Sequence, residues 1–456
     1  MNSFVPKISN FFSLKAGHKR SIKAKKNILQ SFIVKGLNML VSFTLVPITI
    51  NYLSPTTYGV WITITSIVAW FGFFDVGLGH GLRNRFAEAI ANKNHKLARQ
   101  YVSTTYAVVS ILIISLVLIF IIINPIINWN SILNISNEAL RQNELTILSL
   151  IIFSFFGLNF VFQLVNTLLT ADQNPSAAAL IDFIGKAVSL LIIWFLVKEA
   201  DGSIIKLGFV LSGTPVVVLM IASIYLFKGR FKQYMPSISY VDFTKAKDLL
   251  NLGIKFFIIR ISAILLYSTN SIIISQLFGP DQVTPYSISM SYFNTILLMV
   301  NIVVSPFWSA ITEAWVKKEY SWIKKSMNIL IIFWIIMVAL GILMVLVSKL
   351  VYRYWIGEEI QIAFSLSFLA CCWVLSMSWN STFSQFLYGV GAVRLQAYLV
   401  ILLSVLNLPL AIILGKKYGV EGILMANILV SFVQMFVYPI QYYKIINFNA
   451  KGIWRT

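Results

Sequence analysis

The sequence predicts an all-α integral membrane protein with about twelve transmembrane helices, arranged as two parallel six-helix lobes around a central cavity. Hydrophobic residues make up 58% of the 456 residues and charged residues only 11%, whereas a soluble protein has about 25% charged residues. Twelve apolar runs are long enough to span a bilayer, and the last six repeat features of the first six at a constant offset.

A membrane-spanning helix needs about 20 apolar residues. The runs that meet this length are 27–53, 57–79, 100–124, 145–170, 175–197, 206–227, 248–277, 285–311, 326–348, 362–389, 395–414 and 420–443. The first run is longer than the roughly 7–15 residues of a signal-peptide core. We therefore interpret it as the first transmembrane helix and not as a cleaved signal.

The basic residues determine the predicted orientation. The net charge is +20, and 25 of the 36 lysines and arginines fall in the segments on one side of the membrane, against 7 on the other. Basic residues accumulate on the cytoplasmic side of membrane proteins. Both termini are therefore predicted to be cytoplasmic, and the distribution explains the net charge without a nucleic-acid partner.

An internal repeat appears when Pro55 is placed on Pro280, an offset of 225 residues. The same offset places Lys35 on Arg260, Glu88 on Glu313, Lys93 on Lys318 and Arg99 on Lys324. Six spans separate the copies, so both copies have the same orientation, as in transporters with parallel repeats. The predicted divisions are a basic cytoplasmic tail (1–26), an N-terminal lobe (27–228), a cytoplasmic linker (229–247), a C-terminal lobe (248–443) and a second cytoplasmic tail (444–456).

A dense charged segment follows the second span, with the sequence FFDVGLGHGLRNRFAEA over residues 73–89. Its three glycines do not form a dinucleotide-binding fingerprint, because that motif follows a β-strand and this one follows a membrane span. We expect the glycines to allow a tight turn between helices. Asp75 can pair with Arg83 or Arg85, either as a lock on a cytoplasmic gate or as a structural ion pair.

Charged residues inside the spans predict a polar cavity. Inserting one charged side chain at the centre of a membrane helix costs at least about 2.5–3.5 kcal/mol, so such side chains usually face water or a partner. On the first span the spacing places Lys35, Asn38 and Ser42 on one helical face, unless Lys35 extends to the membrane surface. The corresponding stripe on the seventh span is Arg260, Tyr267 and either Asn270 or Ser271. Lys255 is a further candidate base on another face of that span, where it either joins the cavity or extends to the membrane surface.

Asp182 and Lys186 are four residues apart on the fifth span and can pair on one face, either structurally or beside the cavity. The bases outnumber the acids in the spans, which favours an anionic substrate group such as phosphate. No metal site or cofactor is expected: His18, His80 and His95 lack ligand spacing, and the two cysteines are adjacent in an apolar run.

The residues Asp75–Tyr106, with DVGLGHGLRNRFAEAIANKN followed by ARQYVSTTY, resemble the Wzx-type oligosaccharide flippases. These belong to the superfamily that also contains the multidrug and toxin extruders and the lipid II flippase. The resemblance covers the whole chain in layout, although the two additional helices of the lipid II flippase are absent from the twelve predicted spans.

The resemblance implies a flippase that moves undecaprenyl-diphosphate-linked oligosaccharide units from the inner to the outer leaflet of the bacterial cytoplasmic (inner) membrane during O-antigen or capsule assembly. It implies alternating access through a basic cavity, with Lys35, Lys186 and Arg260 on the matching helices. We expect Asp75 to Glu88 and the segment at Glu313 to form the gate, and other membrane proteins of polysaccharide assembly as partners.

No ATP-binding motif is present, so energy is expected from an ion gradient or from consumption of the product, with Asp75 and Asp182 as candidate proton carriers. The alternative is an ion-coupled exporter of drugs or metabolites on the same fold. A membrane enzyme is disfavoured because the predicted outer loops contain no histidine. A purely structural scaffold is disfavoured because polar side chains lie deep in two repeat-related helices.

Overall fold

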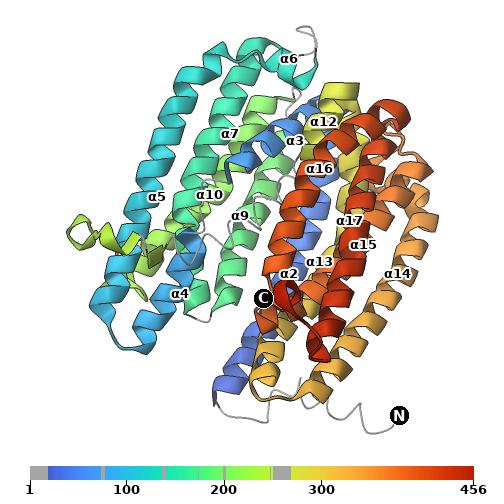
Figure 1. The fold of residues 1–456 in the computed structure, drawn as a ribbon. Coiled ribbons are helices and arrows are strands. Elements are labelled where there is room, and N and C mark those ends of the chain that lie inside the picture. The colour runs from blue at the N-terminus through green and yellow to red at the C-terminus, as the bar shows by residue number, and fades with distance from the viewer. Residues whose placement is uncertain are drawn as a thin grey trace. The chain divides into compact units, whose positions relative to one another are not determined.

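The computed structural model describes residues 19–72, 78–135, 140–172, 174–198, 202–246, 248–249 and 269–455 (Figure 1). Within these residues the chain forms helices and turns and no β-strand, which confirms the prediction of an all-α protein. Hydrogen bonds inside each helix satisfy its backbone groups, as a lipid environment requires.

The α-helices of the described part are α2 (Lys19–Tyr52), α3 (Pro55–Trp70), α4 (Leu78–Ala91), α5 (His95–Ile123), α6 (Trp129–Leu133), α7 (Gln142–Phe162), α8 (Leu164–Ala171), α9 (Pro175–Leu196), α10 (Ile204–Lys228), α12 (Thr269–Phe278), α13 (Val283–Val316), α14 (Tyr320–Ile356), α15 (Phe364–Val390), α16 (Arg394–Tyr418) and α17 (Val420–Ile446). Short 3-10 turns are η2 (Asn124–Ile126), η3 (Lys232–Tyr234), η4 (Ile238–Tyr240), η5 (Pro280–Gln282) and η6 (Gly452–Trp454).

In each of the twelve predicted spans the described residues are mainly helical, although residues 73–77 of the second span and 250–268 of the seventh are not among them. Nine helical stretches of the described part are long and apolar enough to cross a membrane. The fourth span is interrupted at Gln163, between α7 and α8. The first helix already begins at Lys19, inside the segment predicted as a basic tail.

The chain divides into two compact units. Unit 1 contains residues 1–48, 74–127 and 146–257, and unit 2 contains residues 49–73, 128–145 and 258–456. Unit 2 therefore includes α3 and α6, which the predicted two-lobe division assigns to the N-terminal lobe. The division into six-helix lobes remains a prediction.

Unit 2 contains a reciprocal contact between the two copies of the repeat. The Thr284 hydroxyl donates to the Pro55 carbonyl oxygen at 2.6 Å, and a Cβ added to Gly59 would lie 1.9 Å from the Pro280 carbonyl oxygen. At the offset of 225, Pro55 corresponds to Pro280 and Gly59 to Thr284. Position 284 of the second copy therefore contacts Pro55 of the first, and the equivalent position 59 of the first copy lies against Pro280 of the second. Thr56 also hydrogen-bonds its own counterpart, Asp281. These contacts support the repeat at this offset.

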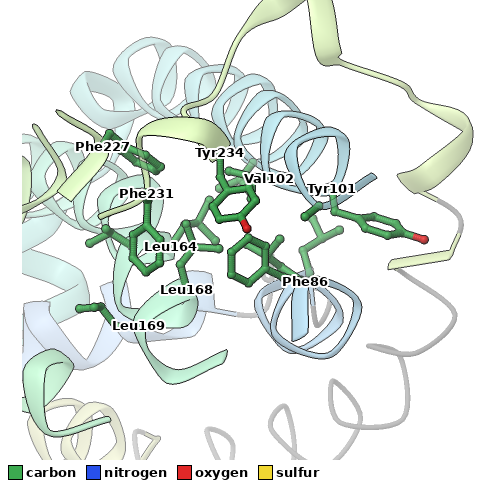
Figure 2. Close-up of a cluster of buried hydrophobic side chains, with 14 of the residues drawn as sticks. Phe86, Tyr101, Val102, Leu164, Leu168, Leu169, Phe227, Phe231 and Tyr234 are labelled. Carbon is green, nitrogen blue, oxygen red and sulfur yellow. The ribbon is translucent and has the colours of Figure 1, made fainter. Parts of the chain in front are cut away.

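Unit 1 is centred on a buried cluster of side chains where α4, α5 and α8 meet the segment after α10 (Figure 2). Phe86 on α4 is fully buried. Its ring packs edge-on against Tyr234, with ring centroids 5.0 Å apart, and against Phe231 at 6.3 Å. Leu164 and Leu168 of α8 complete the cluster. Aromatic burial thus holds the short amphipathic helix α4 against unit 1.

Replacing Phe86 with alanine is expected to destabilise the protein by about 3–5 kcal/mol, because the substitution leaves a cavity among aromatic rings that cannot collapse fully. The matched control is Phe364→Ala, which removes the same atoms from a side chain that is 63% exposed. Thermal unfolding of the detergent-solubilised protein measures both variants. Equal melting temperatures for the two variants would contradict the assignment of Phe86 to a packed core.

The glycines after α3 differ from the expectation. Gly79 and Gly81 are helical residues of α4, so the prediction that they form a turn is wrong for these two. A Cβ on Gly81 would lie 2.4 Å from the Leu249 carbonyl oxygen. Gly81 therefore allows a backbone segment to approach α4 closely, which is the other established use of a glycine in a helix.

Candidate functional site

Two hydrogen bonds join the polar face of α2 to α9 inside unit 1. Asn38 Nδ2 donates to the Ala179 carbonyl oxygen at 3.4 Å, and Lys186 Nζ donates to Ser42 Oγ at 3.3 Å. Asn38 precedes Ser42 on α2, and Ala179 precedes Lys186 on α9, so the two helices run parallel. Parallel orientation is expected for the first and fifth spans, because successive spans alternate in direction. The structure therefore brings together Asn38, Ser42 and Lys186, three of the residues that the sequence predicted for the cavity.

Asp182 lies one turn before Lys186 on α9, and the two side chains attract each other electrostatically. Its carboxylate accepts a hydrogen bond from Asn166 Nδ2 of α8 at 2.9 Å, and Gln163 also lies within hydrogen-bonding reach. The carboxylate is thus placed between a cation on its own helix and two amides from the α7–α8 junction. We refer to Asn38, Ser42, Asn166, Asp182 and Lys186 as the α2–α9 polar cluster.

A close helix contact lies directly before Lys186 in the chain. Gly185, the preceding residue, is buried, and a Cβ at this position would lie 3.1 Å from Pro215 Cα of α10. Small residues let transmembrane helices approach closely. Gly185 thus fixes the α9 backbone against α10, while the side chain of Lys186 itself is exposed.

Lys35 lies on the same face of α2 as Ser42, two turns away, which is about 10 Å along the helix axis. Its side chain is exposed. Among the described residues, Lys35 makes no hydrogen bond and no ion pair. The described part of this face therefore carries the cations of Lys35 and Lys186 against the one carboxylate of Asp182, and it can accept an anionic group.

Several predicted site residues lie outside the described residues, namely Asp75, Lys255, Arg260 and Tyr267. Glu313 belongs to α13, but its side chain is not described. Asn270 is fully buried in unit 2, where its Nδ2 donates to the Tyr286 hydroxyl at 3.1 Å. Asn270 is therefore held between α12 and α13 and does not lie on the surface of the unit. The assignment of these residues to binding or gating remains a prediction.

The predicted gate segment is partly described. On α4, Arg85 Nη1 and Glu88 Oε2 form an ion pair at 2.8 Å across one helical turn. The hydrogen bond to the Glu88 carboxylate raises the pKa of the Arg85 guanidinium above its ordinary value. Arg83 is exposed. Arg85 thus has a partner on its own helix; the pairing of Asp75 with Arg83 or Arg85 remains a prediction.

Sequence reasoning missed two parts of this region. Asn166 and Gln163 were not singled out, although their spacing of three places both amides on one helical face. The ion pair between Arg230, just after α10, and Asp172, just after α8, was also missed. That pair joins segments nearly 60 residues apart, and no local pattern in the sequence indicates it.

Comparison with known proteins identifies a matching family and similar chains. The model of a family described as polysaccharide biosynthesis protein matches residues 24–312. A putative O-antigen transporter of Salmonella typhi is 24% identical over 416 residues, covering 90% of this chain and 92% of that protein. A putative O-antigen export protein of Yersinia pseudotuberculosis is 22% identical, covering 85% and 88%.

Solved structures of multidrug resistance transporters share the fold. An inward-facing MATE family transporter of the MOP superfamily superimposes with a TM-score of 0.70 at 14% identity, covering 97% of this chain and 99% of that one. An outward-facing MATE family transporter gives a TM-score of 0.64 at 15% identity, covering 96% and 98%. These similarities confirm a MATE-like all-helical transporter fold, as the sequence resemblance implied.

Proposed function

The chain belongs to the polysaccharide biosynthesis protein family, and on that premise we propose that it is a flippase for undecaprenyl-diphosphate-linked oligosaccharide units. It would carry them from the inner to the outer leaflet of the bacterial cytoplasmic membrane by alternating access. Its many apolar helices and its O-antigen transporter relatives make it a multi-pass membrane transport protein. The lipid-linked substrate, the alternating access and the cytoplasmic placement of both termini belong to the proposal.

The observation that carries the proposal is the α2–α9 polar cluster with Lys35 beside it. Two cations on adjoining helices, one of them held by Ser42 at 3.3 Å, suit a diphosphate, because ammonium groups form strong charge-assisted hydrogen bonds to phosphate oxygens. In this mechanism the diphosphate contacts Lys35 and Lys186, with Arg260 and Lys255 contributed by the repeat-related helix. The lipid tail stays in the bilayer, so only the polar part of the substrate crosses through protein.

Two other parts of the mechanism follow from named residues. The segment from Asp75 to Glu88, with its counterpart at Glu313, would close the cytoplasmic side after the substrate has bound. Asp182 would take up or release a proton in response to an ion gradient, because its carboxylate lies next to the cation that binds the diphosphate. Asp75 is the second candidate for that proton.

Deletion of the gene tests the proposal. We expect a diphosphate-lipid-linked oligosaccharide to accumulate in the inner leaflet, where a membrane-impermeant glycosidase or label cannot reach it, and to reach the outer leaflet when the gene is restored. A strain that carries an unrelated inner-membrane transporter gene on the same plasmid is the control. Accumulation in the outer leaflet, or none at all, would rule out a flippase.

The same experiment distinguishes the alternative of an ion-coupled exporter of drugs or metabolites, which the fold of the MATE transporters favours. An exporter of that kind predicts increased drug or metabolite retention in the deletion strain and no change in lipid-linked oligosaccharide. The excess of bases over acids on the described face of α2 and α9 supports an anionic substrate instead.

A further inference from the structure

The segment that follows α10 was predicted to be a linker between the two halves, and its described residues 229–246 are folded onto α5. We call these residues the linker segment. Arg99 of α5 donates from Nε to the Met235 carbonyl oxygen at 3.0 Å, and its guanidinium lies 4.1 Å from the centre of the Tyr240 ring. The Asp242 backbone N–H donates to Thr104 Oγ1 at 3.0 Å. A free linker would not make these contacts.

Two further contacts extend the attachment. The Ser237 backbone N–H donates to Ser103 Oγ at 3.2 Å, and His95 Nδ1 hydrogen-bonds the Tyr234 hydroxyl at 2.8 Å. Tyr234 also belongs to the buried aromatic cluster of unit 1. The linker segment is thus held along the first three turns of α5, and in Figure 1 it is the yellow-green part of the chain beside that helix.

The linker segment covers one end of a face of α5 that is directed towards lipid. Thr104 shares a helical face with Ile111, Leu118 and Ile122, since their spacings are 7, 7 and 4 residues. These three side chains are 56%, 56% and 71% exposed, and an exposed apolar stripe on a membrane span contacts acyl chains. Thr104 itself is fully buried, beneath the linker segment. The segment therefore lies where the exposed apolar stripe of α5 ends, and the end of such a stripe on a membrane span is expected near the headgroups.

The outer surface of the linker segment combines exposed apolar side chains with cations. Met235, Ile238 and Phe243 are 50%, 92% and 61% exposed. Lys232 is exposed at the start of the segment, and Lys228, the last residue of α10, is exposed immediately before it. Apolar side chains with neighbouring lysines are typical of protein surfaces that lie in the membrane interface and bind anionic lipid.

We propose that the linker segment is a membrane-surface anchor, which inserts Met235, Ile238 and Phe243 at the boundary of headgroups and acyl chains. Lys228 and Lys232 then contact the anionic headgroups of that leaflet. The leaflet is the cytoplasmic one, a detail that rests on the orientation in the proposed function. The anchor ties the chain between the two halves to α5 and to the lipid surface, so that unit 1 keeps a constant depth in the bilayer.

The anchor is tested with the full-length protein by fluorescence quenching. Ile238→Cys is made in a Cys371→Ala/Cys372→Ala background, labelled with bimane and reconstituted in vesicles of phosphatidylcholine and phosphatidylglycerol that contain a shallow nitroxide lipid. The matched control is Asn92→Cys, an exposed position in the turn between α4 and α5. We expect at least twofold stronger quenching by the nitroxide lipid at position 238 than at 92, and the reverse order with aqueous iodide.

The proposed contact of Lys228 and Lys232 with anionic headgroups is tested separately. Quenching at position 238 is expected to rise when phosphatidylglycerol is added to pure phosphatidylcholine vesicles, and Lys228→Gln/Lys232→Gln is expected to abolish that rise. Equal nitroxide quenching at positions 238 and 92 would overturn the anchor. Shielding from both quenchers would also overturn it, because it would indicate a protein partner. Neither result bears on leaflet transfer of the substrate, so the two proposals fail separately.

Discussion

Substitution of Lys186 by methionine is expected to lower export of the polysaccharide unit at least tenfold. A charge-assisted hydrogen bond contributes about 1.5–3 kcal/mol, and about 1.4 kcal/mol corresponds to a factor of ten in binding. Methionine keeps the length of the side chain but removes the cation, so packing beside Gly185 is preserved. The measurement is the amount of surface polysaccharide in a deletion strain that expresses each variant at the same level.

Two control variants make the Lys186 result specific. Lys186→Arg keeps a cation that binds phosphate and is expected to retain most of the export. Lys198→Ala removes a cation that lies just beyond the end of α9, where it stacks on Trp194 with its Nζ 4.2 Å from the ring centre, and is expected to leave export unchanged. Full export by the methionine variant, with normal expression and a monodisperse elution profile, would exclude Lys186 from substrate binding.

Replacing Gly59 with alanine is expected to lower both the melting temperature and the transport rate. The new Cβ would lie 1.9 Å from the Pro280 carbonyl oxygen, so the two copies of the repeat must separate where Thr284 hydrogen-bonds Pro55. Overpacking of this kind costs about 1–3 kcal/mol, and here the obstructing atom belongs to the backbone and cannot rotate away.

Gly36→Ala is the matched control for Gly59→Ala. Both glycines lie inside helices, but a Cβ at Gly36 would have no atom within 4 Å. Alanine is more favourable than glycine in a helix by roughly 0.5–1 kcal/mol, so this variant should melt at the same temperature as the wild type or slightly above it. Thermal unfolding in detergent measures both. A Gly59→Ala protein as stable as Gly36→Ala would show that the reciprocal contact is absent from the protein in solution.

The transmembrane helices were predictable because the signal for each one is local. A run of about 20 apolar residues can only be helical in lipid, and the runs beginning at 175, 206 and 420 agree closely with α9, α10 and α17. The positions of Pro55 and Pro280 indicated the repeat, and the structure adds the reciprocal contacts between them. The boundaries were less predictable where an amphipathic helix adjoins a span, as at Leu78, where α4 begins inside the range predicted for the second span.

The candidate site was predictable in part. Helical spacing placed Asn38 and Ser42 on one face of α2, and Asp182 and Lys186 on one face of α9, but spacing cannot show which helices are neighbours. The hydrogen bond from Lys186 to Ser42 joins residues 144 positions apart, and the one from Asn166 to Asp182 depends on the break at Gln163. Residues 229–247 were predicted to be a linker. Their contacts with Arg99 and Thr104 could not be predicted, because these residues are more than 130 positions earlier in the sequence.

Composition and order along the chain were thus sufficient to predict a twelve-helix membrane protein, because lipid imposes the same simple requirement on every span. The expected type of transport came from the family resemblance of residues 75–106. Side-chain partnerships required the folded chain. Lys186 was a candidate for anion binding from the sequence, but its contact with Ser42 is visible only in the folded chain, and the linker becomes a candidate anchor through its attachment to α5. Both contacts depend on which elements are neighbours in the fold. That choice is made by packing between residues distant in sequence, which local patterns do not show.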